Sequence, residues 1–188
     1  MRRLKLVSLA ATLVAALSLV TFSARASLVL ALDLAALTTR ADQVVVGEVL
    51  SVRSDWDVAH KKIYSTIEVQ VAETWKGQAP ADGRVIIKQA GGTVGDIEMR
   101  VHGMPRFAAG DRAVLFLRGT VAQAAVVGLG QGMRPLRYDA EARRWMVDAG
   151  DRSAAVRLDG RGHTLPAPPE PALPLEHLRL QVRELARP

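Results

Sequence analysis

The chain has 188 residues, of which 49% are hydrophobic, 23% charged and 4% aromatic, with no cysteine and a formal net charge of +6. This length and hydrophobic fraction suit a single globular domain and exclude a wholly disordered or collagen-like chain. The absence of cysteine excludes a disulfide scaffold and a cysteine-ligated metal site.

The excess positive charge is concentrated at the N-terminus. Arg2, Arg3, Lys5 and Arg25 lie in the first 26 residues, which contain no acid. The other 162 residues hold 21 bases and 19 acids, a net charge of +2. Nucleic-acid binding relies on clustered bases that displace counterions from phosphates, so this nearly balanced domain predicts no nucleic-acid partner.

Residues 1–26 have the three parts of a secretory signal peptide. A basic start precedes an apolar run at 6–22, and the small residues Ala24 and Ala26 suit a signal peptidase. We therefore predict cleavage between Ala26 and Ser27 and a mature protein that is secreted or periplasmic. In the alternative, an uncleaved leader is the chain's membrane anchor, although its apolar run of 17 residues is borderline in length for a hydrocarbon core about 30 Å thick.

Residues 27–160 are predicted to form a mainly β domain. A short helix in the apolar run 28–37 precedes a strand over 43–53, where Gly47 marks a bulge or a bend. Residues 63–75 alternate apolar and polar side chains with period two, which is typical of a strand. This strand is about twice the usual length, which predicts strong coiling or a bend around a small barrel.

Shorter strands are expected after this long one. They span residues 84–89, 97–101, 113–117 and 121–129, followed by a hairpin of 136–138 and 144–147. The glycine-rich segment 91–95 is expected to be a flexible loop. Together these segments predict a small antiparallel β-barrel or a curled sheet.

The composition changes near the C-terminus. Residues 161–174 are rich in proline and predict an extended linker, because proline fits neither a helix interior nor a central strand. Residues 175–188 predict an amphipathic helix that docks on the domain or on a partner. Its apolar stripe consists of Leu175, Leu178, Val182 and Leu185.

Few sequence features indicate bound cofactors. Gly128, Gly130 and Gly132 follow an apolar strand, as in a dinucleotide fingerprint. The third glycine comes one position early, and Pro135 falls where a phosphate-binding helix would run. We therefore expect a glycine-rich strand end and no cofactor.

Signals for catalysis and metal binding are also weak. The four histidines, His60, His102, His163 and His177, lack metal-ligand spacing. No serine lies in a Gly-x-Ser-x-Gly elbow, and there is no thiol. We expect no metal site and no catalytic residue, with one alternative: a pair of carboxylates that meet only in the folded chain.

The best candidate ligand surface lies between residues 91 and 106. Gly91, Gly92, His102 and Arg106 are the candidate residues there, because polar groups on loops often bind ligands. A wide hairpin connection followed by a tight turn is the alternative. Trp56, expected at a hairpin tip, is a further candidate if it is exposed for a partner instead of packing in the core.

Three stretches of the sequence occur in a recognisable order. They are residues 41–49, 63–77 and 110–117. The order resembles a group of uncharacterised secreted bacterial proteins over about residues 34–132 and, more distantly, netrin-like domains, including tissue inhibitors of metalloproteinases. The second resemblance implies a five-stranded OB-type barrel. Those inhibitors chelate the protease zinc through an N-terminal cysteine, whereas the expected first residue here is Ser27.

The predicted function is therefore that of an exported, non-catalytic binding module whose partner is an envelope or secreted protein. A protease-inhibitor-like protein is the second hypothesis. A hydrolase built on dispersed carboxylates is the third.

Overall fold

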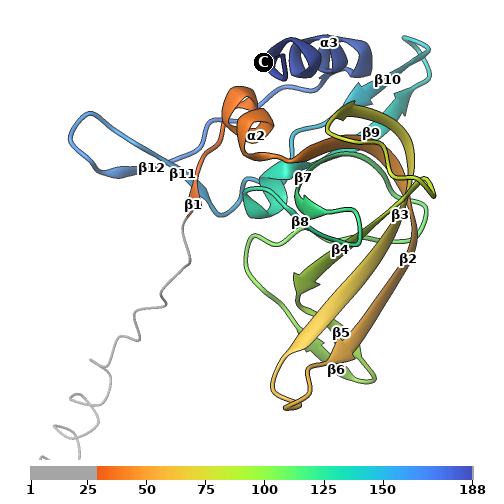
Figure 1. The fold of residues 1–188 in the computed structure, drawn as a ribbon. Helices are drawn as coiled ribbons and strands as arrows, with labels where there is room; N and C mark the ends of the chain where they lie inside the picture. The colour runs from red at the N-terminus through yellow and green to blue at the C-terminus, as the bar shows by residue number, and fades with distance from the viewer. Residues whose placement is uncertain (1–28, 188) are drawn as a thin grey trace, which may run out of the picture.

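A computed structural model of the chain describes residues 29–187 (Figure 1). The expected signal peptide, residues 1–26, and its cleavage site between Ala26 and Ser27 lie outside the described residues. Within the described part, no helix is long and apolar enough to span a membrane.

The structure is mainly β with two α-helices, as predicted. The elements are β1 (Val29–Leu30), α2 (Leu34–Arg40), β2 (Gln43–Trp56), β3 (Ile63–Lys76), β4 (Arg84–Ala90), β5 (Gly92–Val94), β6 (Ile97–Met99), β7 (Arg112–Thr120), β8 (Gln123–Val126), the 3-10 helix η1 (Leu129–Gly132), β9 (Met133–Asp139), β10 (Arg144–Val147), β11 (Ala155–Leu158), β12 (Thr164–Pro166), β13 (Leu173–Pro174) and α3 (Leu175–Leu185).

The first helix begins later than predicted. The Asp33 carboxylate accepts a hydrogen bond from the Ala36 N–H at 2.7 Å and caps the N-terminus of α2. The residues before this cap are extended, and Val29 and Leu30 pair with β11 as a short parallel strand. The apolar run at 28–37 therefore supplies part of a strand as well as a helix.

Two glycine-rich segments also differ from prediction. The expected flexible loop at 91–95 contains β5, which forms a hairpin with β6 around Gly95, whose φ is +57°. The single strand expected at 121–129 is only the four-residue β8. Gly128, at φ +66°, ends this stretch and starts η1, because the left-handed backbone cannot continue a strand.

Most strands belong to one sheet with the order β13-β10-β9-β7-β2-β3-β4-β8. The long hairpin of β2 and β3 lies in the middle of this order (Figure 1). Its register shifts between Val46 and Gly47, so the predicted irregularity at this glycine is confirmed. β7, which contains the expected central strand, pairs with β2, β8 and β9.

The sheet curls back toward itself at β8. This strand pairs antiparallel with β7 and also meets β4, in a parallel contact between Ile87 and Ala124. Because β4 and β8 share only this one residue pair, a closed barrel is not shown. The confirmed result is a curled, mainly β fold with two helices.

The core has two parts, one on each face of the curled sheet. One cluster includes Val45, Ile67 and Leu115, and the other lies under the helices and includes Val44 and Phe116. Neighbouring residues such as Val44 and Val45 enter different clusters because successive strand residues point to opposite faces.

The C-terminal helix docks on its own domain. Leu178 and Val182 of α3 are fully buried in the cluster that also contains Leu37 of α2. Burying one such side chain contributes about 1.5–3 kcal/mol, so these two residues account for much of the docking. Figure 1 shows α3 packed beside α2 at one end of the molecule.

The proline-rich segment at 161–174 is extended, and parts of it pair with the domain. β12 pairs with β11, and β13 pairs with β10, each as the edge strand of its sheet. Edge positions suit proline, which lacks the N–H needed in a central strand.

Candidate functional site

A cavity of about 740 Å³ lies at the distal end of the β2 and β3 hairpin. Strands β2, β3, β5 and β6 contribute to its lining, as does the end of β4. The loop at 100–107, Asp151 and Ser153 complete it. Segments far apart in the sequence therefore meet around one hollow.

Four of the five candidate residues line this cavity. They are Gly91, Gly92, His102 and Arg106. Trp56, the fifth, lies at the end of β2, where its ring centroid is 6.3 Å from that of His60, and it is not a lining residue. Whether any of these residues binds a ligand stays a prediction.

Two serines form part of the lining. The hydroxyls of Ser54 on β2 and Ser65 on β3 are 2.9 Å apart, and Ser65 donates to the Gly91 carbonyl at 2.7 Å. A Cβ added at Gly92 would overlap both hydroxyl oxygens, and the φ of this residue is +141°. Only glycine fits there, so Gly92 lets β5 lie directly on the serine pair.

The loop at 100–107 is fixed from two sides. The Gln89 side-chain amide donates to the Pro105 carbonyl at 2.9 Å, and the Gly130 N–H donates to the Gly103 carbonyl at 2.7 Å. Gly103 has a φ of +78°, and a Cβ there would lie 2.9 Å from the Ala154 methyl. These contacts within the chain fix the loop as one wall of the cavity, so no ligand is needed to order it.

The charged side chains at the cavity differ in how well they are paired. Arg100 binds Glu98 through two hydrogen bonds of 2.6 and 2.8 Å. These bonds, and more weakly the charge of Arg106, lower the pKa of Glu98, and Glu98 raises the pKa of Arg100. The side chains of Arg106 and His102 have no hydrogen-bond or ion-pair partner among residues 29–187, so they are available to a ligand.

The cavity also contains two carboxylates that sequence reasoning could not bring together. Glu98 and Asp151 both line it, together with His102. The lowered pKa of Glu98 makes this group a poor proton donor near neutral pH. Asp151 accepts a hydrogen bond from the Ser153 N–H at 2.8 Å. Both carboxylates therefore already have partners within the chain, and Glu98 is poorly suited to acid catalysis.

The histidines do not gather. His60 lies at the tip of the β2 and β3 hairpin, and His177 lies on α3. The Nδ1 atom of His163 is 3.1 Å from a carboxylate oxygen of Asp159. In the described part of the chain, no three His, Asp or Glu side chains are grouped so that they could hold a metal ion.

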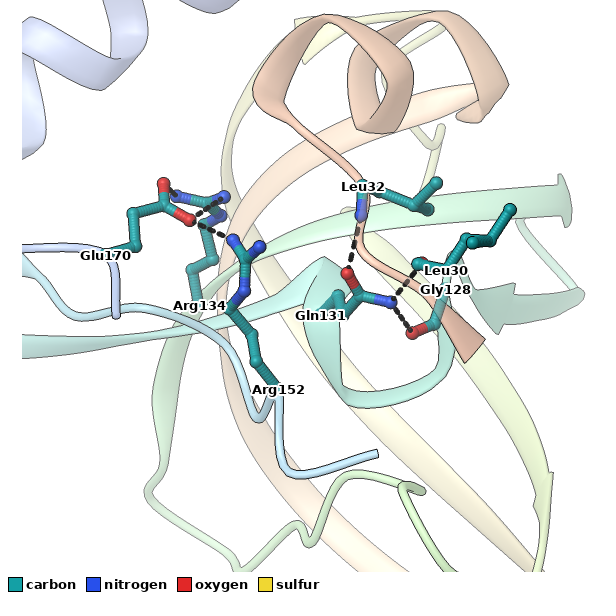
Figure 2. A network of polar contacts seen from close by, with 7 residues as sticks. All are labelled: Leu30, Leu32, Gly128, Gln131, Arg134, Arg152 and Glu170. Atoms are coloured by element: carbon teal, nitrogen blue, oxygen red, sulfur yellow. Dashed lines mark hydrogen bonds and ion pairs between the residues drawn. The ribbon is translucent and has the colours of Figure 1, made fainter. Parts of the chain in front are cut away.

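A buried ion cluster involves a residue next to the cavity lining (Figure 2). Arg134 on β9 is only 2% exposed and binds Glu170 at 2.6 and 3.1 Å, and Arg152 binds the same carboxylate at 2.7 Å. The Arg134 guanidinium also lies 5.9 Å from the centroid of the Phe116 ring. Because Asp151 and Ser153 flank Arg152, this cluster helps to fix them at the cavity.

Gln131 holds the N-terminal segment against η1. Its side-chain oxygen accepts from the Leu32 N–H at 2.8 Å, and its amide nitrogen donates to the carbonyls of Leu30 and Gly128, both at 3.2 Å (Figure 2). No local sequence pattern indicated this role, because Leu30 and Leu32 are about 100 residues away along the chain.

The cavity thus combines walls that are already fixed, two carboxylates that are already engaged, and Arg106, which has no partner in the part of the chain that the structure describes. No protein-family model matches the chain, and no curated protein matches it significantly.

Proposed function

We propose that this chain is an exported, non-catalytic binding module whose ligand occupies the cavity at the end of the β2 and β3 hairpin. The observation that carries the proposal is the cavity itself, about 740 Å³ in volume with walls fixed by hydrogen bonds. Small-molecule sites typically have volumes of about 300–1,000 Å³. Walls that need no ordering lower the cost of binding.

The ligand that best fits this lining carries a negatively charged group. Arg106 and His102 offer donors that no described side chain uses, whereas Glu98 already pairs with Arg100. Met104 and Phe107 add apolar surface beside these donors. An acidic side chain or the C-terminal carboxylate of an envelope or secreted protein has this chemistry.

We also propose that the curled sheet is an OB-type barrel. The strand pairing supports this, because β2, β3, β4, β8 and β7 pair in that order and β7 in turn pairs with β2. An OB barrel is likewise a five-stranded, partly open barrel.

The binding proposal is tested with tripeptides that end in aspartate or asparagine, with free and amidated C-termini. In a titration followed by NMR, we expect the aspartate or free-carboxylate peptides to shift the amide signals of Gly91, Gly92 and Gly103 in a saturable manner. Arg106→Gln should weaken this binding about tenfold, because a hydrogen bond to a charged group contributes about 1.5 kcal/mol.

Arg157→Gln is the matched control, because Arg157 is exposed on β11 and does not line the cavity. This variant should bind like the unaltered protein. The proposal is wrong if none of the peptides gives a saturable shift near the cavity, or if Arg106→Gln leaves the affinity unchanged.

A hydrolase is the second candidate, since Glu98, Asp151 and His102 line the same cavity. The relevant assay measures turnover of ester, glycoside and peptide substrates by the purified protein and by Asp151→Asn. Turnover that disappears in this variant would establish catalysis and displace the non-catalytic proposal.

A further inference from the structure

A second hollow, of about 240 Å³, lies between the end of α2 and the hairpin of β7 and β8. It shares no lining residue with the first cavity. Its lining residues are Arg40, Arg118, Ala125, Val126, Val127 and Gly128. Two arginines and no acid thus line this hollow among the described residues.

Neither guanidinium has a partner within the described range. Arg84 and Arg112, whose side chains are 50% and 51% exposed, each pair with a carboxylate at 2.5 and 2.7 Å. Arg40 and Arg118 are exposed too, yet they form no hydrogen bond or ion pair with residues 29–187. Each guanidinium group carries five N–H donors, and no residue in this range uses them.

The Arg40 side chain is also not needed to stabilise the C-terminal end of α2. Two carbonyls at the end of α2, those of Thr38 and the capping residue Ala41, accept hydrogen bonds from the Lys76 ammonium, both at 2.7 Å. A cation at a helix C-terminus normally stabilises such carbonyls. Because Lys76 on β3 does this, the helix end places no demand on the Arg40 side chain.

The backbones that carry the two arginines are fixed to one another. The Asp42 N–H donates to the Leu117 carbonyl at 2.8 Å, and the Asp42 carboxylate accepts from the Gly119 N–H at 2.8 Å. The Leu117 and Gly119 groups lie on either side of Arg118, so these bonds join β7 to Asp42, two residues after the end of α2. The same bonds engage Asp42, the nearest acid in the sequence to Arg40.

We propose that Arg40 and Arg118 form a binding site for a phosphoryl group. Two guanidinium groups can each donate paired hydrogen bonds to phosphoryl oxygens, and the added negative charge offsets the repulsion between the cations. The hollow is smaller than a typical pocket for a drug-sized ligand. It suits an anionic group with few attached atoms, either free phosphate or the headgroup of a lipid.

The test titrates the intact mature protein with inorganic phosphate, at an ionic strength held constant with chloride, and follows the amide signals of Gly119, Ala125 and Gly128 by NMR. We expect saturable shifts at these residues with a millimolar Kd. Arg40→Gln and Arg118→Gln should each weaken binding about tenfold, the loss expected for a charge-assisted hydrogen bond.

Arg53→Gln is the matched control, since Arg53 is exposed on β2 and does not line the hollow. Circular dichroism checks that each variant is folded. Equal phosphate binding by Arg118→Gln and the unaltered protein, or a shift that never saturates, would overturn the proposal.

A second arm separates the two sources of the group. Sedimentation with vesicles that contain phosphatidylglycerol, compared with vesicles of phosphatidylcholine alone, measures binding to an anionic headgroup. Binding that requires phosphatidylglycerol and is lost in the Arg40→Gln and Arg118→Gln double variant assigns the site to a lipid. Saturable phosphate binding without vesicle binding assigns it to a soluble ligand, and both results support the site.

Discussion

Gly47 is a residue whose missing side chain lets the two strands of the main hairpin lie close together. A Cβ at this position would lie 2.5 Å from a Val69 methyl and 2.7 Å from the Gln70 carbonyl oxygen. We expect Gly47→Ala to lower the free energy of unfolding by about 1–3 kcal/mol, because the strands must move apart. Urea unfolding measures this loss.

Gly160→Ala is the control for this effect. A Cβ at Gly160 has no atom within 4 Å, so its substitution should change the free energy of unfolding by no more than about 0.5 kcal/mol. Equal effects of the two substitutions would contradict the proposed role of the close strand contact.

Glu170 is the second residue whose loss should be costly. Its carboxylate neutralises Arg134, which is 2% exposed, and also binds Arg152. Glu170→Ala leaves these cations without a counter-charge and should lower the free energy of unfolding by about 2–3 kcal/mol. This is less than the loss for a fully buried pair, because the Glu170 side chain is 26% exposed.

The exposed pair of Glu48 and Arg112 provides the comparison. Glu48→Ala should cost no more than about 1 kcal/mol, since solvent screens this pair. If chemical denaturation gives the same loss for both glutamates, the buried cluster does not stabilise the fold as described.

The two residues differ in how far the sequence predicted them. An isolated glycine in a β-branched strand is a local signal, so the irregularity at Gly47 could be predicted. The pairing of Arg134 with Glu170 joins residues 36 positions apart and depends on how the proline-rich segment docks. No spacing rule connects them.

At the scale of elements, the tip of the β2 and β3 hairpin is expected to respond to acid. The Asp57 carboxylate accepts from the N–H groups of Lys61 and Lys62 at 2.7 and 3.1 Å, and these bonds lower its pKa. A lowered folded-state pKa stabilises the turn above the unfolded-state pKa, and this stabilisation is lost as pH falls through the folded-state value.

Acidification should therefore increase hydrogen exchange at the Lys61 and Lys62 amides, beyond the intrinsic pH dependence of exchange, before the core unfolds. Asp57→Ala should produce the same change at neutral pH. Asp55→Ala is the control, because the Asp55 carboxylate accepts no hydrogen bond among the described residues. Protection at these amides that is the same in both variants would show that the carboxylate does not hold the turn.

Elements were predicted best where periodicity was long. The alternation at 63–75 identified β3, and the apolar stripe of the last helix identified α3. The missed strands are β1, β5, β11, β12 and β13, which have two to four residues each, too few to show a clear period, and are defined by their pairing partners. The start of α2 depended on a capping contact at Asp33 rather than on apolar spacing.

For the molecule as a whole, charge and composition predict export of the chain but do not predict a ligand. Four bases of the expected leader account for most of the +6 net charge, and the domain that follows is almost neutral. Four of the candidate ligand residues came from one short segment, and the fold places them at one cavity. The same cavity is also lined by Ser54, Ser65 and Asp151. Strand register and loop packing place these residues there, and the sequence alone does not reveal either.

The most direct test of the binding proposal is a crystal structure of residues 27–188, the expected mature protein, with the tightest-binding acidic tripeptide. We expect peptide density in the cavity beside Gly92 and the loop at 100–107, with a carboxylate in contact with Arg106. A peptide bound elsewhere, or a cavity that holds only solvent at saturating peptide concentration, would contradict it.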